Sequence, residues 1–201
     1  EGGDPRRSPI ASAGPPRASG ADFAVNLLTG ASVASDTERM LAEVDGISLR
    51  MPYQAEPTAR RSINAGSMDY VDIHLSHVAQ QVWEGYYGHV DIAVVEVSGI
   101  TETGELIPPS ASIGNNKTWL DVAEKIILEV NSWVPTAMAG IHDVYYGTAL
   151  PPPHRKPIML TAVEDRIGQT TFRVDPDKVV AVVETNAPRQ RQRLTPPPDA
   201  V

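Results

Sequence analysis

The sequence contains no cysteine, and this absence excludes a whole set of chemistries. Disulfide bonds, zinc–thiolate sites, iron–sulfur clusters and cysteine nucleophiles all need a thiol. Any covalent catalysis by this chain must therefore use oxygen or nitrogen atoms. The absence also fits a protein of a reducing compartment.

The chain also lacks long apolar runs and an excess of positive charge. No apolar stretch approaches the roughly 20 residues of a membrane-spanning helix. With 17 basic and 25 acidic side chains the formal charge is -8, and such a field repels nucleic acid and anionic lipid. We therefore expect neither a nucleic-acid nor a membrane partner. The 201 residues, 41% hydrophobic, suffice for one large or two small soluble domains.

Signatures of nucleotide binding and of serine hydrolysis are missing as well. No Gly-x-Gly-x-x-Gly occurs, so nothing supports a dinucleotide site. The sequence IGNNKT at 113–118 lacks the glycine that precedes the lysine of a P-loop. Ser32, in TGASVAS, lacks the second glycine of a nucleophile elbow, so a hydrolase triad is not indicated.

Composition divides the chain into a core and two tails. The first residue is Glu1, and no signal peptide follows it, so we expect a chain that is processed or cut from a longer protein. Residues 1–21 are rich in proline, arginine and alanine and contain too little apolar surface to fold. Residues 187–201 repeat that composition and are interpreted as a linker or tail. The folded domain is predicted over 22–186.

Within this domain, short β-branched runs alternate with helical patterns. The alternation predicts an α/β fold with three α/β/α layers and an open, mainly parallel sheet. Three of the runs are almost continuously apolar, as in central strands that are buried on both faces. The predicted strands are 23–28, 47–50, 91–97, 125–130 and 179–184, with a weaker sixth run at 158–162.

Three helices are predicted between these strands from their start and stop signals. Pro57 suits the first turn of a helix that stops at Gly66. Asp72 is the predicted cap of a second helix, which ends at Gly85. The third helix is expected over roughly 118–123, directly before a strand.

Two histidine-containing groups are candidates for chemistry, each with a structural alternative. His74 and His77 lie three residues apart on a predicted helix, a spacing that can place two imidazoles near one metal ion. No carboxylate completes that set, so we predict no metal site and favour local hydrogen bonds of His74. The pair His142–Asp143 either orients a catalytic group or fastens its loop, and we favour the second interpretation.

Two carboxylates stand near the carboxyl ends of apolar strands, Glu96 and Glu129. Ligands of open α/β sheets bind at this edge, and a buried carboxylate there must be paired or protonated. The two groups therefore suggest either a general acid/base pair or, as we favour, caps of neighbouring loop amides.

The loop from Ser110 to Asn116 is the best candidate for binding an anion. A glycine among small polar residues before a helix lets backbone amides approach a carboxylate or phosphate. An ordinary asparagine cap of the following helix is the alternative interpretation.

Several segments together resemble the acetyl-CoA hydrolase/CoA-transferase family. They cover almost all of residues 23–186 in the family's order, whereas residues 1–20 replace its Ser-Gly-Phe-Thr-type turn. The segments are LLTGAS (27–32), MPYQAEPTARRSINAG (51–66), DIAVVEVSGITETGELIPPSASIGNN (91–116), GIHDV (140–144) and FRVDPDKVVAVVETN (172–186).

The resemblance implies two similar α/β domains with the active site between them. The family's glutamate attacks the acyl-CoA thioester and then carries CoA to a second carboxylate, with CoA as substrate and with no cofactor. That glutamate belongs to a second domain that this chain does not reach, so no catalytic residue is assigned here. The implied substrate-binding residues of this chain are Ser32, Ser112, Gly114, Asn115 and Asn116.

The resemblance leaves three functions open for this chain. It is the amino-terminal domain of a CoA-transferase for acetyl- or succinyl-CoA, or part of an acetyl-CoA hydrolase, or an inactive fragment that acts as a scaffold. We expect the chain alone to be inactive and the full-length protein to be a homodimer. Its expected partners are acyl-CoA, a small carboxylate and the second domain. Its expected location is cytoplasmic, or mitochondrial in a eukaryote.

Overall fold

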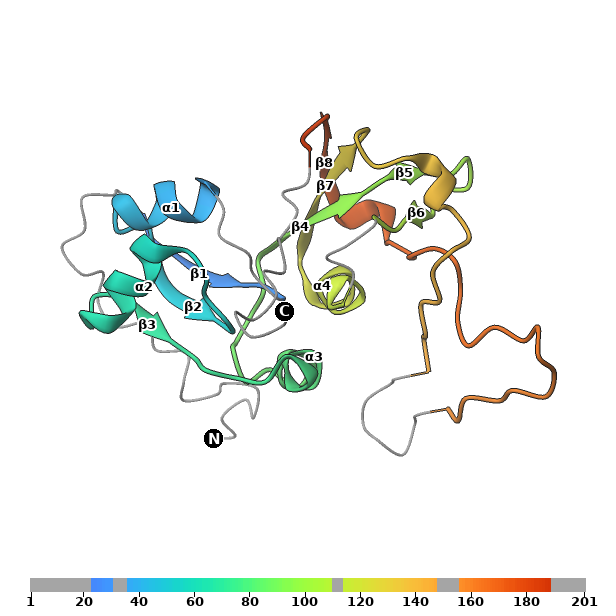
Figure 1. Cartoon of the computed structure of the whole chain (residues 1–201), viewed down its shortest axis with the longest axis horizontal. Helices are drawn as coiled ribbons and strands as arrows, with labels where there is room; N and C mark the ends of the chain where they lie inside the picture. The colour runs from blue at the N-terminus through green and yellow to red at the C-terminus, as the bar shows by residue number, and fades with distance from the viewer. Residues whose placement is uncertain (1–22, 31–35, 110–113, 148–155, 189–201) are drawn as a thin grey trace, which may run out of the picture.

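The computed structural model of the protein describes residues 23–30, 36–109, 114–147 and 156–188 (Figure 1). Almost all of both expected tails lies outside these residues, so the domain boundaries stay predictions. The elements in order are β1 (Val25–Leu28), α1 (Asp36–Glu43), β2 (Ile47–Met51), α2 (Pro57–Asn64), β3 (Asp69–Tyr70), α3 (Leu75–Trp83), β4 (Ile92–Val97), β5 (Gly99–Ile100), β6 (Leu106–Ile107), α4 (Asn116–Val122), β7 (Lys125–Asn131), η2 (Thr136–Met138), η4 (Pro176–Lys178) and β8 (Val179–Thr185).

The strands form two parallel sheets of three strands each. The first has the order β1-β2-β3 and the second the order β4-β7-β8, and every neighbouring pair in them is parallel. A short antiparallel pair, β5 with β6, stands beside the second sheet (Figure 1). This arrangement confirms the α/β class and the mainly parallel strands that the sequence predicts.

Helices pack on both sheets through small apolar clusters. Ala42 of α1 and Ala59 of α2 are buried with Ile47 of β2, so these helices belong to the first sheet. Leu120 of α4 is buried in the largest cluster, whose other members include Val95 and Ile126 of the second sheet.

Helix α3 joins the two halves of the molecule. Its Val78 and Val82, one turn apart on the same face, are buried against Met51 of β2. Trp119 and Val122 of α4 pack against the same cluster from the other side. Figure 1 shows α3 beneath α4, where the chain passes from β3 of the first sheet to β4 of the second.

The predicted helix ends are confirmed for α2 and α3, with one correction. Gly66 and Gly85 follow these helices with φ of 73° and 79°, a backbone conformation that glycine adopts without strain. The predicted cap Asp72 was wrong, because α3 begins later and His74 is the residue before its first turn. The His74 ring nitrogen Nδ1 accepts a bond of 3.3 Å from the amide of Ser76.

The predicted strand at 158–162 was wrong. No residue of this run pairs with a described strand, and Ile158, Met159 and Leu160 are 52%, 72% and 55% exposed. An apolar run predicts a strand only where a neighbouring strand is available to it, and this run stands apart from both sheets.

The prediction that the apolar strands are buried on both faces was also wrong for β4 and β8. Burial alternates along β4, where Ile92 and Val94 are 54% and 65% exposed while Ala93 and Val95 are buried. Ala93 and Val95 pack in one cluster with Leu120 of α4, whereas the described residues leave Ile92 and Val94 on the opposite face exposed.

Candidate functional site

The end of β1 lies next to the loop before α4. A Cβ atom built on Gly30 would stand 3.6 Å from Nδ2 of Asn115, so the backbone after β1 contacts that side chain. The carboxyl ends of parallel strands are where ligands of open α/β folds bind. The contact thus brings together two segments that the sequence identifies as candidates, LLTGAS and SASIGNN.

Three of the five predicted binding residues are described. Gly114 lines a hollow of the surface. Asn115 precedes the first turn of α4 but makes no side-chain capping bond, so the interpretation as an ordinary asparagine cap is not supported. Nδ2 of Asn116 is buried and has no hydrogen-bond partner among the described residues. Ser32 and Ser112 lie outside the described residues.

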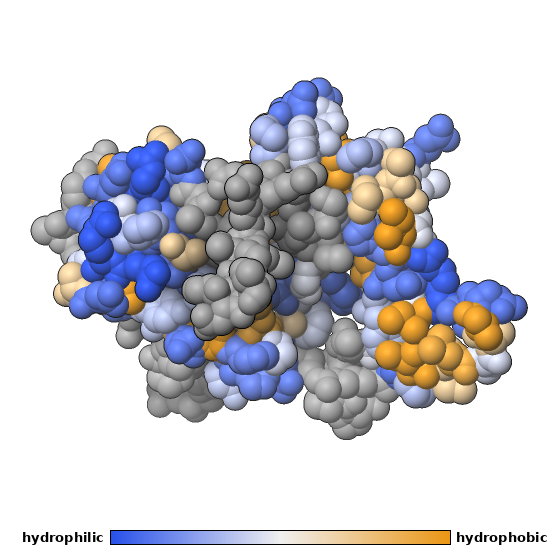
Figure 2. Space-filling model, in the orientation of Figure 1, coloured by the Kyte–Doolittle hydropathy of each residue, from blue (hydrophilic) through white to orange (hydrophobic). Residues whose placement is uncertain are grey.

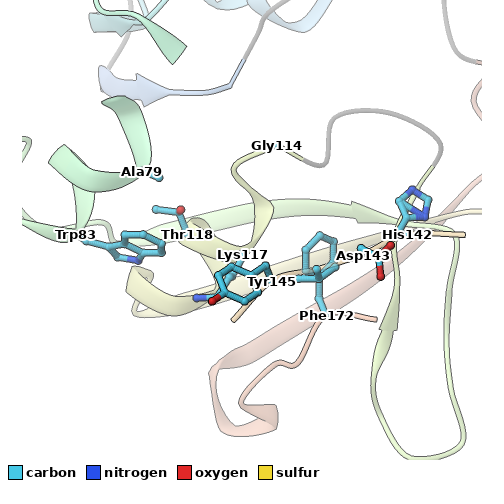
Figure 3. A pocket seen from close by; sticks show the side chains of 10 residues that line it. Ala79, Trp83, Gly114, Lys117, Thr118, His142, Asp143, Tyr145 and Phe172 are labelled. Atoms are coloured by element: carbon cyan, nitrogen blue, oxygen red, sulfur yellow. The ribbon is translucent and has the colours of Figure 1, made fainter. Parts of the chain in front are cut away.

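The hollow has a volume of about 350 Å³ and opens between α3, α4 and the loop that follows η2 (Figure 3). Its walls are largely apolar, and aromatic rings form much of them. The residues that line it are Ala79, Trp83, Gly114, Lys117, Thr118, His142, Asp143, Val144, Tyr145 and Phe172.

Lys117 carries a positive charge at the hollow, and a carboxylate and two aromatic rings of the protein already surround this charge. Its Nζ lies 4.9 Å from the ring centroids of both Trp83 and Tyr146, and 2.5 Å from Oδ2 of Asp121. Cations over aromatic faces are attracted to them. Lys117 therefore fastens α3, α4 and the loop at 142–147 to one another.

Tyr146 completes this contact on the loop side. Burial raises the pKa of its phenol, although the bond that its oxygen accepts from the Arg173 amide, at 2.8 Å, acts in the opposite direction. The phenol therefore stays neutral at physiological pH and keeps its ring as a partner for cations.

The pair His142–Asp143 fastens its loop, as favoured from the sequence. Oδ1 of Asp143 accepts a bond of 2.9 Å from Nε of Arg166, and Nη2 of Arg166 donates to the His142 carbonyl at 3.0 Å. Nδ1 of His142 is buried without a partner among the described residues, and the side chain lines the hollow.

Glu96 and Glu129 do not belong to the hollow. They are register partners on β4 and β7. Glu96 accepts a bond of 2.9 Å from the Asn131 side chain, and Glu129 accepts one of 2.8 Å from the Thr185 hydroxyl. Both of these bonds come from side chains at the ends of β7 and β8.

No metal centre emerges from the part of the chain that the structure describes. The rings of His74 and His77 lie 5.9 Å apart, but no group of three or more metal-ligating side chains is found among the described residues. Within the same residues, no helix is long and apolar enough to cross a bilayer.

Comparison with known proteins assigns this architecture to a family. The family described as "Acetyl-CoA hydrolase/transferase N-terminal domain" matches residues 16–184. The chain belongs to this family. The match covers every helix and strand described above except the last residue of β8, and it confirms the resemblance noted from the sequence.

Several curated members of the acetyl-CoA hydrolase/transferase family are similar to this chain. A "Propanoyl-CoA:succinate CoA transferase" of Escherichia coli K12 is 40% identical over 166 residues, which are 83% of this chain and 33% of that protein. A "Succinyl-CoA:acetate CoA-transferase" of Clostridium kluyveri is 39% identical over 174 residues, 87% of this chain and 32% of that protein. An "Acetyl-CoA hydrolase" of Schizosaccharomyces pombe is 40% identical over 167 residues, 80% of this chain and 31% of that protein.

The chain thus spans about a third of the length of these relatives. Sequence reasoning found the family, and its selection of the loop at 114–116 as a binding site stays a prediction, but it missed Lys117 as a structural centre. Only its spacing to Asp121, four residues along one helix, was visible in the sequence. Its aromatic partners, Trp83 and Tyr146, come from two other segments and carry no local signal.

Proposed function

We propose that this chain is the amino-terminal domain of a CoA-transferase that moves CoA between an acyl-CoA, such as succinyl- or acetyl-CoA, and a small carboxylate such as acetate. The observation that carries the proposal is the identity of 40% and 39% to two CoA-transferases over more than four fifths of the chain. The attacking glutamate lies in a second domain, within the two thirds of those relatives that this chain does not cover.

The proposed chemistry needs only oxygen and sulfur nucleophiles. A glutamate oxygen attacks the thioester carbonyl, the carbon–sulfur bond breaks, and an acyl-glutamyl anhydride and CoA thiolate form. The thiolate then attacks the glutamyl carbonyl, which releases the first carboxylic acid as its anion and leaves glutamyl-CoA. The second carboxylate reverses these steps and departs as the new acyl-CoA. Neither a metal ion nor another cofactor takes part, since CoA is itself a substrate.

In this reaction the amino-terminal domain contributes binding rather than covalent catalysis. Gly114, Asn115 and Asn116, together with Ser32 and Ser112, are the residues that we assign to the acyl or carboxylate group. The buried amide nitrogen of Asn116 supports this assignment, because an unpaired buried donor gains a hydrogen bond when an anion arrives. The hollow beside Gly114 supplies an apolar wall for the carbon chain.

Product analysis of the full-length protein tests the proposal. Succinyl-CoA and acetate should yield acetyl-CoA and succinate in equal amounts, with little free CoA. The second candidate is an acetyl-CoA hydrolase, which the Schizosaccharomyces pombe relative favours. In that case acetyl-CoA alone should release acetate and free CoA. If the full-length protein forms neither set of products, an inactive scaffold is the remaining function.

A pair of asparagine variants tests the assignment of this domain to binding. Asn116→Ala in the full-length protein should raise the KM for the carboxylate about tenfold or more, as loss of one hydrogen bond to a charged group costs about 1.5–3 kcal/mol. Asn64→Ala, on the exposed end of α2, is the matched control and should leave KM unchanged. The 201-residue chain alone should transfer no CoA, because it lacks the proposed nucleophile.

The remaining expectations about the full-length protein follow from the same proposal. We expect a homodimer located in the cytoplasm, or in the mitochondrion of a eukaryote, that acts on soluble acyl-CoA and carboxylates. Neither nucleic acid nor a membrane is among its proposed partners.

A further inference from the structure

Residues 156–171, here called the arm, place many large apolar side chains on the surface. Figure 1 shows the arm standing away from both sheets, and Figure 2 shows hydrophobic side chains gathered over the same region. The exposed apolar residues of the arm are Ile158 (52%), Met159 (72%), Leu160 (55%), Val163 (102%) and Ile167 (42%).

The tip of the arm is held in one shape by a single carboxylate. Oδ2 of Asp165 accepts bonds from the Thr161 amide at 2.7 Å, the Thr161 hydroxyl at 2.9 Å and the Ala162 amide at 2.8 Å. These bonds close a turn at the end of the apolar run. The apolar side chains beside it are therefore presented on an ordered turn and not on a free loop.

The base of the arm is fixed to the body of the domain. Arg166 binds Asp143, and the backbones of Val144 and Gln169 exchange two hydrogen bonds, of 2.7 Å and 2.9 Å. A Cβ atom on Gly168 would stand 2.6 Å from the Val144 carbonyl, so the two backbones touch at this point. A braced segment loses little conformational entropy when it binds a partner.

A cluster of this kind needs an explanation beyond the ordinary exposure of single apolar residues. Scattered exposed leucines or valines are normal, whereas contiguous apolar surface marks an interaction site. The arm also carries Glu164, Asp165 and Arg166 beside the apolar run, and an apolar centre with a polar rim is typical of a protein interface.

We propose that the arm is a docking surface for the part of the full-length polypeptide that lies outside this chain. The relatives are about three times as long as the segment they share with it, and the matched family is an amino-terminal domain, so they carry ample polypeptide to cover the arm. The inference rests on one part of the proposed function, namely that the full-length protein contains further polypeptide outside this chain, as its relatives do. It assigns no substrate and no catalytic step to the arm.

Two methionines provide an internal comparison for the test. Met159 in the arm and Met40 on α1 are 72% and 61% exposed, so in the 201-residue chain hydrogen peroxide should oxidise both at similar rates. In the full-length protein Met159 should react at least about tenfold more slowly, because the oxidant must wait for the docked arm to open. Met40 should be unaffected. Equal reactivity of the two methionines in the full-length protein would overturn the proposal.

A photo-crosslinker identifies what covers the arm. We would place p-benzoylphenylalanine at Leu160 of the full-length protein and sequence the crosslinked peptides. The expected product has the mass of one chain and joins position 160 to a segment beyond residue 201. A crosslink between two chains would assign the arm to a second copy and refute the proposed occupant, as would the absence of any crosslink.

A charged variant separates the arm from the proposed reaction. Leu160→Asp should restore rapid oxidation of Met159 in the full-length protein but leave the unfolding of the 201-residue chain unchanged, since Leu160 is exposed there. If CoA transfer is observed while Met159 remains reactive in the unaltered full-length protein, the arm proposal fails and the proposed function stands. If Met159 is protected but no CoA is transferred, the arm proposal stands and the proposed function fails.

Discussion

Arg50 and Glu38 form a buried ion pair, and the loss of either partner should destabilise the first sheet. Arg50, on β2, is fully buried, and its Nη2 donates to Oε1 of Glu38 at 2.7 Å, from α1. Its Nη1 also donates to the Met51 carbonyl. At an effective dielectric constant of about 20, unit charges 4 Å apart attract by about 4 kcal/mol.

Replacing one partner leaves the other charge buried without that attraction. Arg50→Met, which keeps the apolar volume, should therefore lower the free energy of unfolding by about 3–5 kcal/mol. Small domains have only about 5–15 kcal/mol in total. Adding Glu38→Leu to this variant should recover most of the loss, since an apolar pair of similar volume avoids the desolvation of both charges.

Urea unfolding followed by tryptophan fluorescence measures these changes as a double-mutant cycle. Arg39→Met is the matched control, because Arg39 contacts Asp36 and Glu43 on the exposed side of the same helix and should leave the midpoint nearly unchanged. Additive losses from the Arg50 and Glu38 substitutions, or an Arg50 variant as stable as the Arg39 variant, would refute the reasoning.

Two further predictions concern single residues. Burial raises the pKa of the Glu56 carboxyl, but bonds from the amides of Ala59 and its neighbour outweigh it and hold the pKa below its usual value. This α2 cap therefore stabilises the fold above about pH 4, and the stabilisation is lost as pH falls through the folded pKa. Glu56→Gln should lower the free energy of unfolding by about 1 kcal/mol at pH 7. In acid, the stability of this variant should depend less on pH than that of the unaltered chain. Profiles of stability against pH that run parallel for the two proteins would contradict this prediction. Gly168→Ala should cost about 1–3 kcal/mol, since its Cβ would overlap the Val144 backbone. Gly114→Ala, whose Cβ would meet no atom of the described residues within 4 Å, should leave the melting temperature unchanged, and equal melting temperatures of the two variants would count against the close contact at Gly168.

The strands and helices that the sequence predicts share one property, a local pattern that agrees with the final packing. The apolar runs of β4, β7 and β8 and the start and stop signals of α2 are examples. Helix α1 was missed because its buried face includes Glu38, a residue that no apolar periodicity reveals. The two-residue strands β3, β5 and β6 are too short to show alternation.

The errors arose where burial depends on distant segments. The run at 158–162 has the composition of a strand, yet its surroundings place it in the exposed arm. The outer face of β4 also carries two apolar residues, Ile92 and Val94, yet both are exposed while Val95 is buried. Composition reports what a segment can bury, whereas topology decides whether a partner is present to bury it.

The same distinction between local pattern and distant contacts applies to the candidate site. Gly114 and Asn116 were selected from turn chemistry, because glycine and asparagine at a helix start have a local meaning, and their role in binding stays a prediction. The electrostatics of the hollow did not follow from the sequence, since Asp121 and two rings match the charge of Lys117, and Arg166 matches that of Asp143. A ligand in the hollow would thus meet matched charges together with the His142 side chain. The proposed function asks no more of this domain than binding, since it assigns the covalent step to a residue of another domain.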